Sequence, residues 1–234
     1  MTRLRATMQW DVRLQWRNGF YYAAIAVVVV WLLIANQIPT ETLVWLLPMM
    51  LMGNLIIGTF YFMGGLVLLE KEEGSLEARA TTPLRPAEYL AAKAATLTGL
   101  TVLESSLIVI VSYGFGVNWL VLLAGVVETA VFFCLAGFIV VARYDSVNQY
   151  LLPSILYVSL LGLPLGAYLA GWNHWLLILH PMQATLTLLE GAWQPLNWWQ
   201  TGYGLVYPAL CIAWLAHLSL RTFHRFIIAK QGVK

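Results

Sequence analysis

One stretch of this chain, residues 43–69, runs for 27 residues without an Asp, Glu, Lys or Arg. An α-helix rises ~1.5 Å per residue, so a helix of this length is long enough to cross the ~30 Å hydrocarbon core of a bilayer with some tilt. The stretch therefore predicts a membrane-spanning helix. Small residues let membrane helices approach closely, so we expect close helix packing at its four glycines: Gly53, Gly58, Gly64 and Gly65.

The composition agrees with a chain that lies mostly in a membrane. Hydrophobic residues make up 60% of the sequence and charged residues 10%, whereas soluble domains carry about 25% charged residues. The net charge of +2 comes from dispersed cations, which argues against nucleic acid as a partner. Cys134 and Cys211 each lie inside an apolar run, so neither a disulfide framework nor a cysteine metal site is expected. We predict an all-α polytopic membrane protein.

Apolar and polar runs divide the chain into elements of a single transmembrane domain, 1–234. The run 175–189 is only 15 residues long and has His180 and Pro181 at its middle, so it is short for a crossing and is expected to be re-entrant. The expected segments are an amphipathic N-terminal helix (1–19), spans at 20–38, 43–69, 94–116, 117–142, 150–171 and 198–220, a cytoplasmic loop (70–93), the re-entrant element (175–189) and a cytoplasmic tail (221–234).

The positions of the cations favour six spans over seven. With six spans, all 13 Lys and Arg residues lie on one face, in the N-terminal helix, the loop, the turn at Arg143 or the tail. The positive-inside rule makes this face cytoplasmic, with both termini on it. A seventh span at 175–189 would place the basic tail outside.

The N-terminal helix has an apolar side formed by Leu4, Met8, Val12 and Trp16, which predicts a helix lying on the membrane surface. A solvated leader is the alternative.

Residues 69–93 form a polar segment between two spans and hold nine of the chain's 24 charged residues. Charges are costly inside a bilayer, so we expect the whole segment to lie in water. Gly74 permits a sharp turn and Ser75 can cap a short helix after it. Pro86 suits the first position of the next helix, with Glu88 near that helix's positive end. A solvated loop without a partner is the simpler alternative.

Glu104 and Glu128 interrupt two of the predicted spans. Counted from the nearest cytoplasmic cations, they lie ~16 Å and ~22 Å along their helices, deep in the membrane. Carboxyl groups there are protonated, paired or facing water, and the spans offer no Lys or Arg to pair them. They could serve a substrate pathway for a cationic or zwitterionic amphiphile. The structural alternative is a protonated carboxyl that bonds to nearby hydroxyls: Ser105, Ser106 or Thr129.

The predicted outer face is rich in aromatic side chains, which an interfacial belt explains and an exit for aromatic compounds would also use. His174 and His180 lack the spacing and carboxylate partners of a metal site, and His180 before Pro181 is expected to cap a helix locally. No metal site is predicted. The aromatic residues are Trp172, Trp175, Trp193, Trp198 and Trp199, with Tyr168 and Tyr203.

Sequence motifs for nucleotide hydrolysis or catalysis are absent. The chain has no GxxxxGK[ST] phosphate loop, no HExxH pair and no GxSxG elbow. The longest predicted segment outside the membrane is about 25 residues, below the ~50 residues of a small domain. If ATP drives this protein, a second chain must hydrolyse it, so no enzyme activity is expected here.

The polar segment resembles a known family. Its residues 70–77, EKEEGSLE, followed by TPLRP at 82–86 and EYL at 88–90, are similar to the first cytoplasmic loop of ABC-2 type transporter permeases. The resemblance extends to the arrangement of segments along the whole chain. ARYDS at 142–146, YLLPS at 150–154, His180-Pro181 and Gly191-Ala192 are most similar to small permeases named as fluoroquinolone exporters.

This resemblance implies a fold, a function and partners. The fold would be the ABC-2, or type V exporter, fold, in the cell membrane of a prokaryote. The chain would be the permease subunit of an ATP-driven exporter of a drug-like or amphiphilic compound. Two ABC ATP-binding subunits, which hold ATP and Mg, and a second permease subunit, identical or homologous, would be its partners. Coupling to the ATPase would fall on Glu73, Gly74, Ser75, Leu76, Glu77, Thr82, Pro83 and Leu84, with Leu76 as the apolar contact and Asp145 as a weaker one.

Two other classes of function stay open. A secondary transporter or channel could use Glu104 and Glu128 without ATP, and an intramembrane enzyme could use them with the two histidines. A self-sufficient carrier would not need a loop built for docking. The 69–93 segment therefore favours the exporter subunit.

Overall fold

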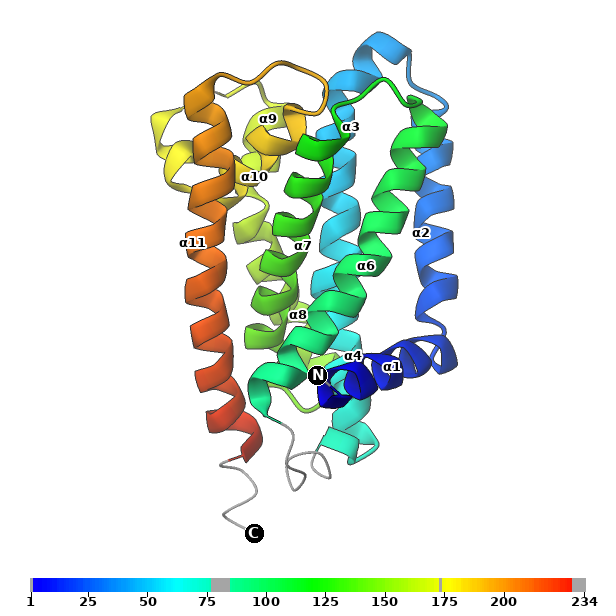
Figure 1. The fold of residues 1–234 in the computed structure, drawn as a ribbon, viewed down its shortest axis with the longest axis vertical. Coiled ribbons are helices and arrows are strands. Elements are labelled where there is room, and N and C mark those ends of the chain that lie inside the picture. The colour runs from blue at the N-terminus through cyan, green and yellow to red at the C-terminus, as the bar shows by residue number, and fades with distance from the viewer. Residues whose placement is uncertain (1, 77–84, 173, 229–234) are drawn as a thin grey trace.

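The computed structural model describes residues 2–76, 85–172 and 174–228. Within these ranges every regular element is a helix (Figure 1), as predicted for an all-α protein. Glu77, Thr82, Pro83 and Leu84 lie outside the described residues. In chain order the elements are α1 (Thr2–Arg17), α2 (Phe20–Ala35), α3 (Thr40–Leu55), the π-helical turn η1 (Ile56–Tyr61), α4 (Phe62–Glu72), α6 (Pro86–Ser112), α7 (Trp119–Val141), α8 (Val147–Leu161), α9 (Leu163–Leu169), the 3-10 turn η2 (Trp175–Leu179), α10 (Pro181–Glu190), α11 (Trp198–Phe223) and the π-helical turn η3 (His224–Ile228).

Four to six helical stretches of the described chain can cross a membrane. Four are long and apolar enough by themselves: Thr40–Glu72, Pro86–Ser112, Trp119–Val141 and Trp198–Ile227. Two more arise if each of two bent pairs counts as one span: α1 with α2, bent by 67°, and α8 with α9, bent by 53°. The second bend precedes Pro164, whose missing N–H favours a break between helices.

Helix α7 forms the middle of the bundle and packs against α4, α6, α10 and α11. Gly137 of α7 lies directly against η1, where a Cβ would come within 2.7 Å of the Phe60 carbonyl oxygen. The glycines of the 43–69 run likewise lie against side chains of α2, α6 and α8. These contacts agree with the close packing expected at the glycines.

Helix α1 lies across one end of the bundle, the end at which α11 and η3 also finish (Figure 1). Thr7, Asp11 and Gln15, spaced four apart, are buried against the bundle. On the predicted apolar side, Val12 is 42% and Trp16 63% exposed. The helix therefore turns a polar side inwards and leaves apolar side chains available to a membrane surface.

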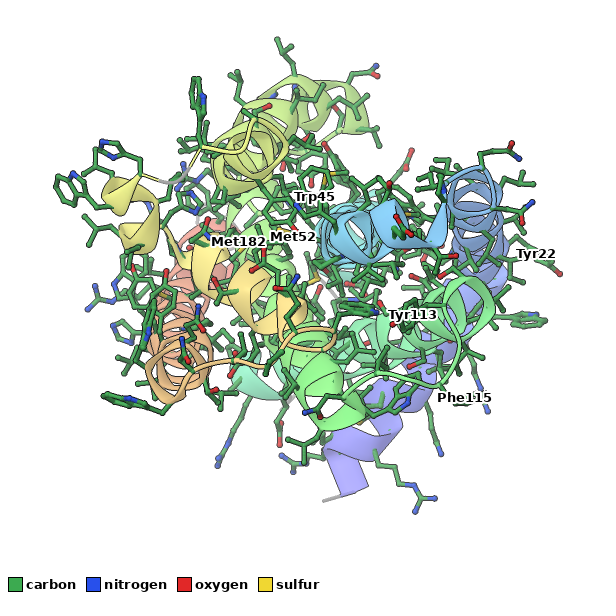
Figure 2. The ribbon with its side chains drawn as sticks, turned by 90° about the horizontal axis from the view of Figure 1, so that it is seen from above. Tyr22, Trp45, Met52, Tyr113, Phe115 and Met182 are labelled. Atoms are coloured by element: carbon green, nitrogen blue, oxygen red, sulfur yellow. The ribbon has the colours of Figure 1, made fainter. Side chains whose placement is uncertain are left out.

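The opposite end of the bundle carries the short elements η2 and α10. Helix α10 packs against α3, α7 and α11, whereas no residue of η2 is buried. Figure 2, seen from this end, shows Met52 of α3 and Met182 of α10 near the middle of the molecule, with Tyr22 and Phe115 at its rim. His180 caps α10, because its Nδ1 accepts a hydrogen bond from Met182 N at 3.2 Å. The predicted capping role is confirmed.

Candidate functional site

Three charged side chains from three helices meet inside the α1 end of the bundle. The Nζ of Lys93, on α6, lies 3.3 Å from Asp11 Oδ1 of α1 and 3.0 Å from Glu70 Oε1 of α4. All three side chains are fully buried. Buried charges are tolerated when opposite charges and hydrogen bonds compensate them, and each carboxylate here faces the ammonium group. We call Asp11, Glu70 and Lys93 the ionic cluster.

Tyr89 completes the surroundings of the ionic cluster. Its hydroxyl donates to Glu70 Oε2 at 2.6 Å, and the centre of its ring lies 5.0 Å from Lys93 Nζ. The same ring packs against Phe138 of α7 and Phe223 of α11. The cluster is thus held on one side by the aromatic contacts that join α6 to α7 and α11.

The expectation that all of residues 69–93 lie in water is wrong at both ends of this segment. Glu70 belongs to the last turns of α4, and Lys93 lies inside α6, which begins at Pro86 as predicted. Hydropathy counts each charge as a cost of burial, but opposite charges from separate helices offset that cost when they meet. The pairing joins residues 11, 70 and 93, and no pattern within one segment reveals it.

Two further contacts tie α1 to the same helices. Gln15 Nε2 donates to Thr96 Oγ1 of α6 at 3.0 Å. Arg17 pairs with Glu73 just beyond α4, with side chains 57% and 39% exposed. Helix α1 is therefore joined to the elements on both sides of residues 77–84.

Lys71 links the end of α4 to the turn between α7 and α8. Its Nζ donates to the carbonyl oxygens of Ala142 at 2.9 Å and Tyr144 at 2.6 Å, where the last carbonyls of a helix need partners. It also lies 3.6 Å from Asp145 Oδ1. Asp145, expected as a weaker coupling residue, is thus connected to the first loop through Lys71.

The described part of the expected coupling segment comprises Glu73, Gly74, Ser75 and Leu76. Gly74 has a φ of 67°, the left-handed conformation expected for a sharp turn, and Ser75 Oγ donates to the Glu70 carbonyl oxygen at 3.3 Å. Leu76 is only 2% exposed and belongs to the chain's own apolar core. Leu76, expected as the apolar contact with a partner, is thus packed within the chain itself in this conformation, and its coupling role stays a prediction.

A second polar pair lies inside the bundle. Asn54, at the end of α3, donates from Nδ2 to Glu104 Oε2 of α6 at 3.0 Å. Glu104 is 5% exposed, and its Oε1 is buried without a hydrogen-bond partner. A Cβ on Gly58 would come within 3.0 Å of Glu104 Oε2, so this glycine makes room for the carboxyl group. The partner of Glu104 is an amide from another helix, not one of the nearby hydroxyls.

Asn54 was not among the predicted site residues. An amide in the middle of a charge-free run was the available signal, because polar side chains in membrane helices tend to bond across helices. Glu128 of α7 is half-buried, with its Oε2 buried and unpartnered. Within the described residues, no hydrogen bond or ion pair joins Glu128 to Glu104. The two expected pathway residues are thus not bonded to each other, and their shared role stays a prediction.

Comparison with known proteins decides the family. The model of the fluoroquinolones export permease protein family matches residues 2–231, nearly the whole chain. The chain belongs to the fluoroquinolones export permease protein family. Two proteins named fluoroquinolones export permease protein, from Mycobacterium tuberculosis strains CDC 1551 / Oshkosh and ATCC 25618 / H37Rv, are each 32% identical over 236 residues that cover both chains fully. No solved structure matches the chain.

Membership of this permease family confirms the resemblance to small export permeases and makes the chain a membrane permease.

The aromatic residues at the end of the bundle opposite α1 fall into two groups. Trp172, Trp175 and Trp198 are 72%, 67% and 88% exposed, as an interfacial belt requires. Tyr203 and Tyr207 instead donate to the carbonyl oxygens of η2 at 2.7 and 2.6 Å, and so tie η2 to α11.

Proposed function

We propose that this permease is the membrane-spanning subunit of an ATP-driven ABC exporter with the ABC-2 fold and six spans. It works beside a second permease subunit, identical or homologous, and two ATP-binding subunits dock on the loop around residues 73–84. ATP and Mg are held by those partners, since the chain has no phosphate-binding loop of its own. Both termini and this loop face the cytoplasm, and the protein lies in a prokaryotic cell membrane.

One observation carries the docking proposal. The loop connects α4 to α6 in the chain, and α4 ends and α6 begins at the end of the bundle where α1 and η3 lie (Figure 1). A displacement of this loop therefore acts directly on two candidate spans. Lys71 and Asp145 extend the contact to the α7–α8 turn, which favours Asp145 as a secondary docking residue.

The relatives' name suggests fluoroquinolones as the first compounds to test. A fluoroquinolone is a drug-like amphiphile, the class that the sequence resemblance implies. We propose that Glu104 and Glu128 line its pathway, because each has a buried carboxyl oxygen without a partner that a polar group of the substrate could satisfy.

The docking proposal is tested by purifying the intact permease from its native membrane and assaying for a co-purifying ATPase. The test variant is Glu77→Lys with Leu84→Asp, and the matched control is Gln194→Lys with Leu196→Asp between α10 and α11. We expect the wild type and the control to retain an ATPase, and the test variant to lose it at unchanged yield and monodispersity. If the purified wild type carries no ATPase, the docking proposal fails and an ATP-independent carrier that uses Glu104 and Glu128 becomes the better hypothesis.

A further inference from the structure

The ionic cluster joins three helices, two of which precede and follow the proposed docking loop along the chain. Asp11 comes from the middle of α1, Glu70 from the last turns of α4 before the loop, and Lys93 from α6 after it. One ammonium group thus bonds two carboxylates that lie 82 and 23 residues from it along the chain. The contact closes a ring through α1, α4 and α6 at the point where the loop begins and ends.

Burial makes these contacts stiff. The three side chains have no solvent-accessible surface, so water cannot replace a broken contact unless the helices separate. Separation would leave a carboxylate and an ammonium group uncompensated in an apolar surrounding, which is far costlier than loosening an exposed pair. Gln15 and Thr96 add a further hydrogen bond between α1 and α6.

We propose that Asp11, Glu70 and Lys93 are positioning residues that join α1, the end of α4 and the beginning of α6 into one rigid block. In the exporter, a partner docked on the loop moves this block as a unit, so α1 moves together with the loop-bearing ends of both helices. The role in transmission rests on the proposed function; the rigidity of the block does not.

The outward face of α1 determines which movements of the block are easy. Trp10, Val12 and Trp16 are 48%, 42% and 63% exposed and would lie at the membrane surface. Lifting them into water exposes apolar area, whereas sliding or tilting within the surface does not. Helix α1 therefore converts a push on the loop into a displacement along the membrane.

The rigidity is measured first on the isolated full chain in lipid nanodiscs. Spin labels are placed at Gln9→Cys on α1 and Ala91→Cys on α6, both exposed positions, after Cys134 and Cys211 have been replaced by Ala. Pulsed electron resonance then gives the distance distribution between α1 and α6. We expect one narrow distribution in the otherwise wild-type chain, and a broad or bimodal one would overturn the proposal without any variant.

Two variants separate the buried cluster from surface charge. Lys93→Met removes the ammonium group and keeps an apolar stem, and we expect it to broaden the distribution about twofold. Arg17→Gln removes the exposed pair between α1 and Glu73, just beyond α4, and should leave the distribution unchanged. If Lys93→Met proves unstable, Asp11→Asn combined with Glu70→Gln and Lys93→Met leaves no unpaired charge and should broaden it likewise. An unchanged width in a folded variant would overturn the proposal.

The role in transmission is measured in the complex with the ATPase. With labels at Gln9→Cys and Glu72→Cys, the distance between α1 and α4 should stay constant when ATP is added. A label pair that joins Gln9→Cys to Leu120→Cys at the far end of α7 should change its distance. If ATP alters the distance between α1 and α4 in the wild type, the block is not rigid and this inference fails while the docking proposal stands. If no ATPase co-purifies, the measurement on the isolated chain still decides rigidity.

Discussion

At the scale of single residues, the bundle buries polar side chains that have a single hydrogen-bond partner each. Asn54 and Glu104 form a single hydrogen bond between α3 and α6 in an apolar interior. A buried polar group that loses its partner costs about 1–3 kcal/mol, so the two residues should depend on each other. This dependence can be measured without knowing the substrate.

We predict that Asn54→Leu lowers the free energy of unfolding of the purified permease by about 1–3 kcal/mol, because the Glu104 carboxyl group loses its donor. Glu104→Leu should cost a similar amount. The double variant should cost less than the sum, since neither polar group is then left alone. Ser106→Ala, at a half-buried position on the same helix, is the control. Strictly additive losses in thermal unfolding would show that the two side chains do not interact.

A second prediction at this scale concerns pH and Glu190. Burial raises the pKa of the Glu190 carboxyl above its ordinary value of 4.5, and a hydrogen bond with Tyr168 lowers it. Because its pKa is higher in the folded state, Glu190 contributes stability below pH 4.5, and this contribution is lost as the pH rises toward the folded pKa. Thermal scans from about pH 4 to about pH 8 should show this loss in the wild type.

The loss of stability with rising pH that Glu190 causes should be absent in Glu190→Gln, which cannot ionise. It should be larger in Tyr168→Phe, which lacks the hydrogen bond that lowers the pKa of Glu190. Parallel stability profiles for the wild type and Glu190→Gln would show that Glu190 contributes nothing to the pH dependence.

At the scale of secondary structure, the contact between α7 and η1 places a glycine directly against backbone atoms. Gly137 faces the backbone of Phe60 within a π-helical turn, and backbone atoms cannot move aside as the end of a side chain can. Gly99 on α6, by contrast, has nothing within 4 Å of the position of a Cβ. The two glycines therefore allow a matched comparison.

We expect Gly137→Ala to destabilise the permease by about 1–3 kcal/mol, because α7 must move away from η1. Gly99→Ala should be neutral or stabilising by about 0.5–1 kcal/mol, since alanine favours a helix. Thermal unfolding of both variants in the same detergent provides the test. Equal effects at the two positions would show that the contact with Phe60 does not limit packing.

At the scale of the whole molecule, the topology separates two ends with different chemistry. One end carries α1, the ionic cluster and η3, and the other carries η2, α10 and the exposed Trp172, Trp175 and Trp198. The proposed orientation places the first end in the cytoplasm. Cysteine labelling from either side of the membrane measures this directly.

In a chain without Cys134 and Cys211, Gln37→Cys and Gln194→Cys should react with an impermeant maleimide added to intact cells. Gln9→Cys and Asn148→Cys should react only after the membrane is permeabilised. All four positions are exposed, so access to them depends on the membrane alone. Reaction of Gln9→Cys and Gln194→Cys from the same side would contradict the six-span topology.

The sequence alone determined the helical class, the membrane and the family, because these follow from local properties. The charge-free run 43–69, the helix start at Pro86 and the cap at His180 each depend on residues close together along the chain. The sharp turn at Gly74 belongs to the same group. Such features survive in any fold that keeps the segment helical.

Tertiary structure alone decided which polar residues are buried and which partners they bond. From the sequence, Glu70 and Lys93 are expected to be exposed to water. The fold instead buries them beside Asp11, which comes from a helix far away along the chain. Leu76, expected to contact a partner, packs within the chain's own bundle, and Glu104 accepts a hydrogen bond from Asn54 instead of a neighbouring hydroxyl. The physical reason is the same each time: the cost of burying a charge or the gain from burying a side chain depends on its partners, and those come from other helices.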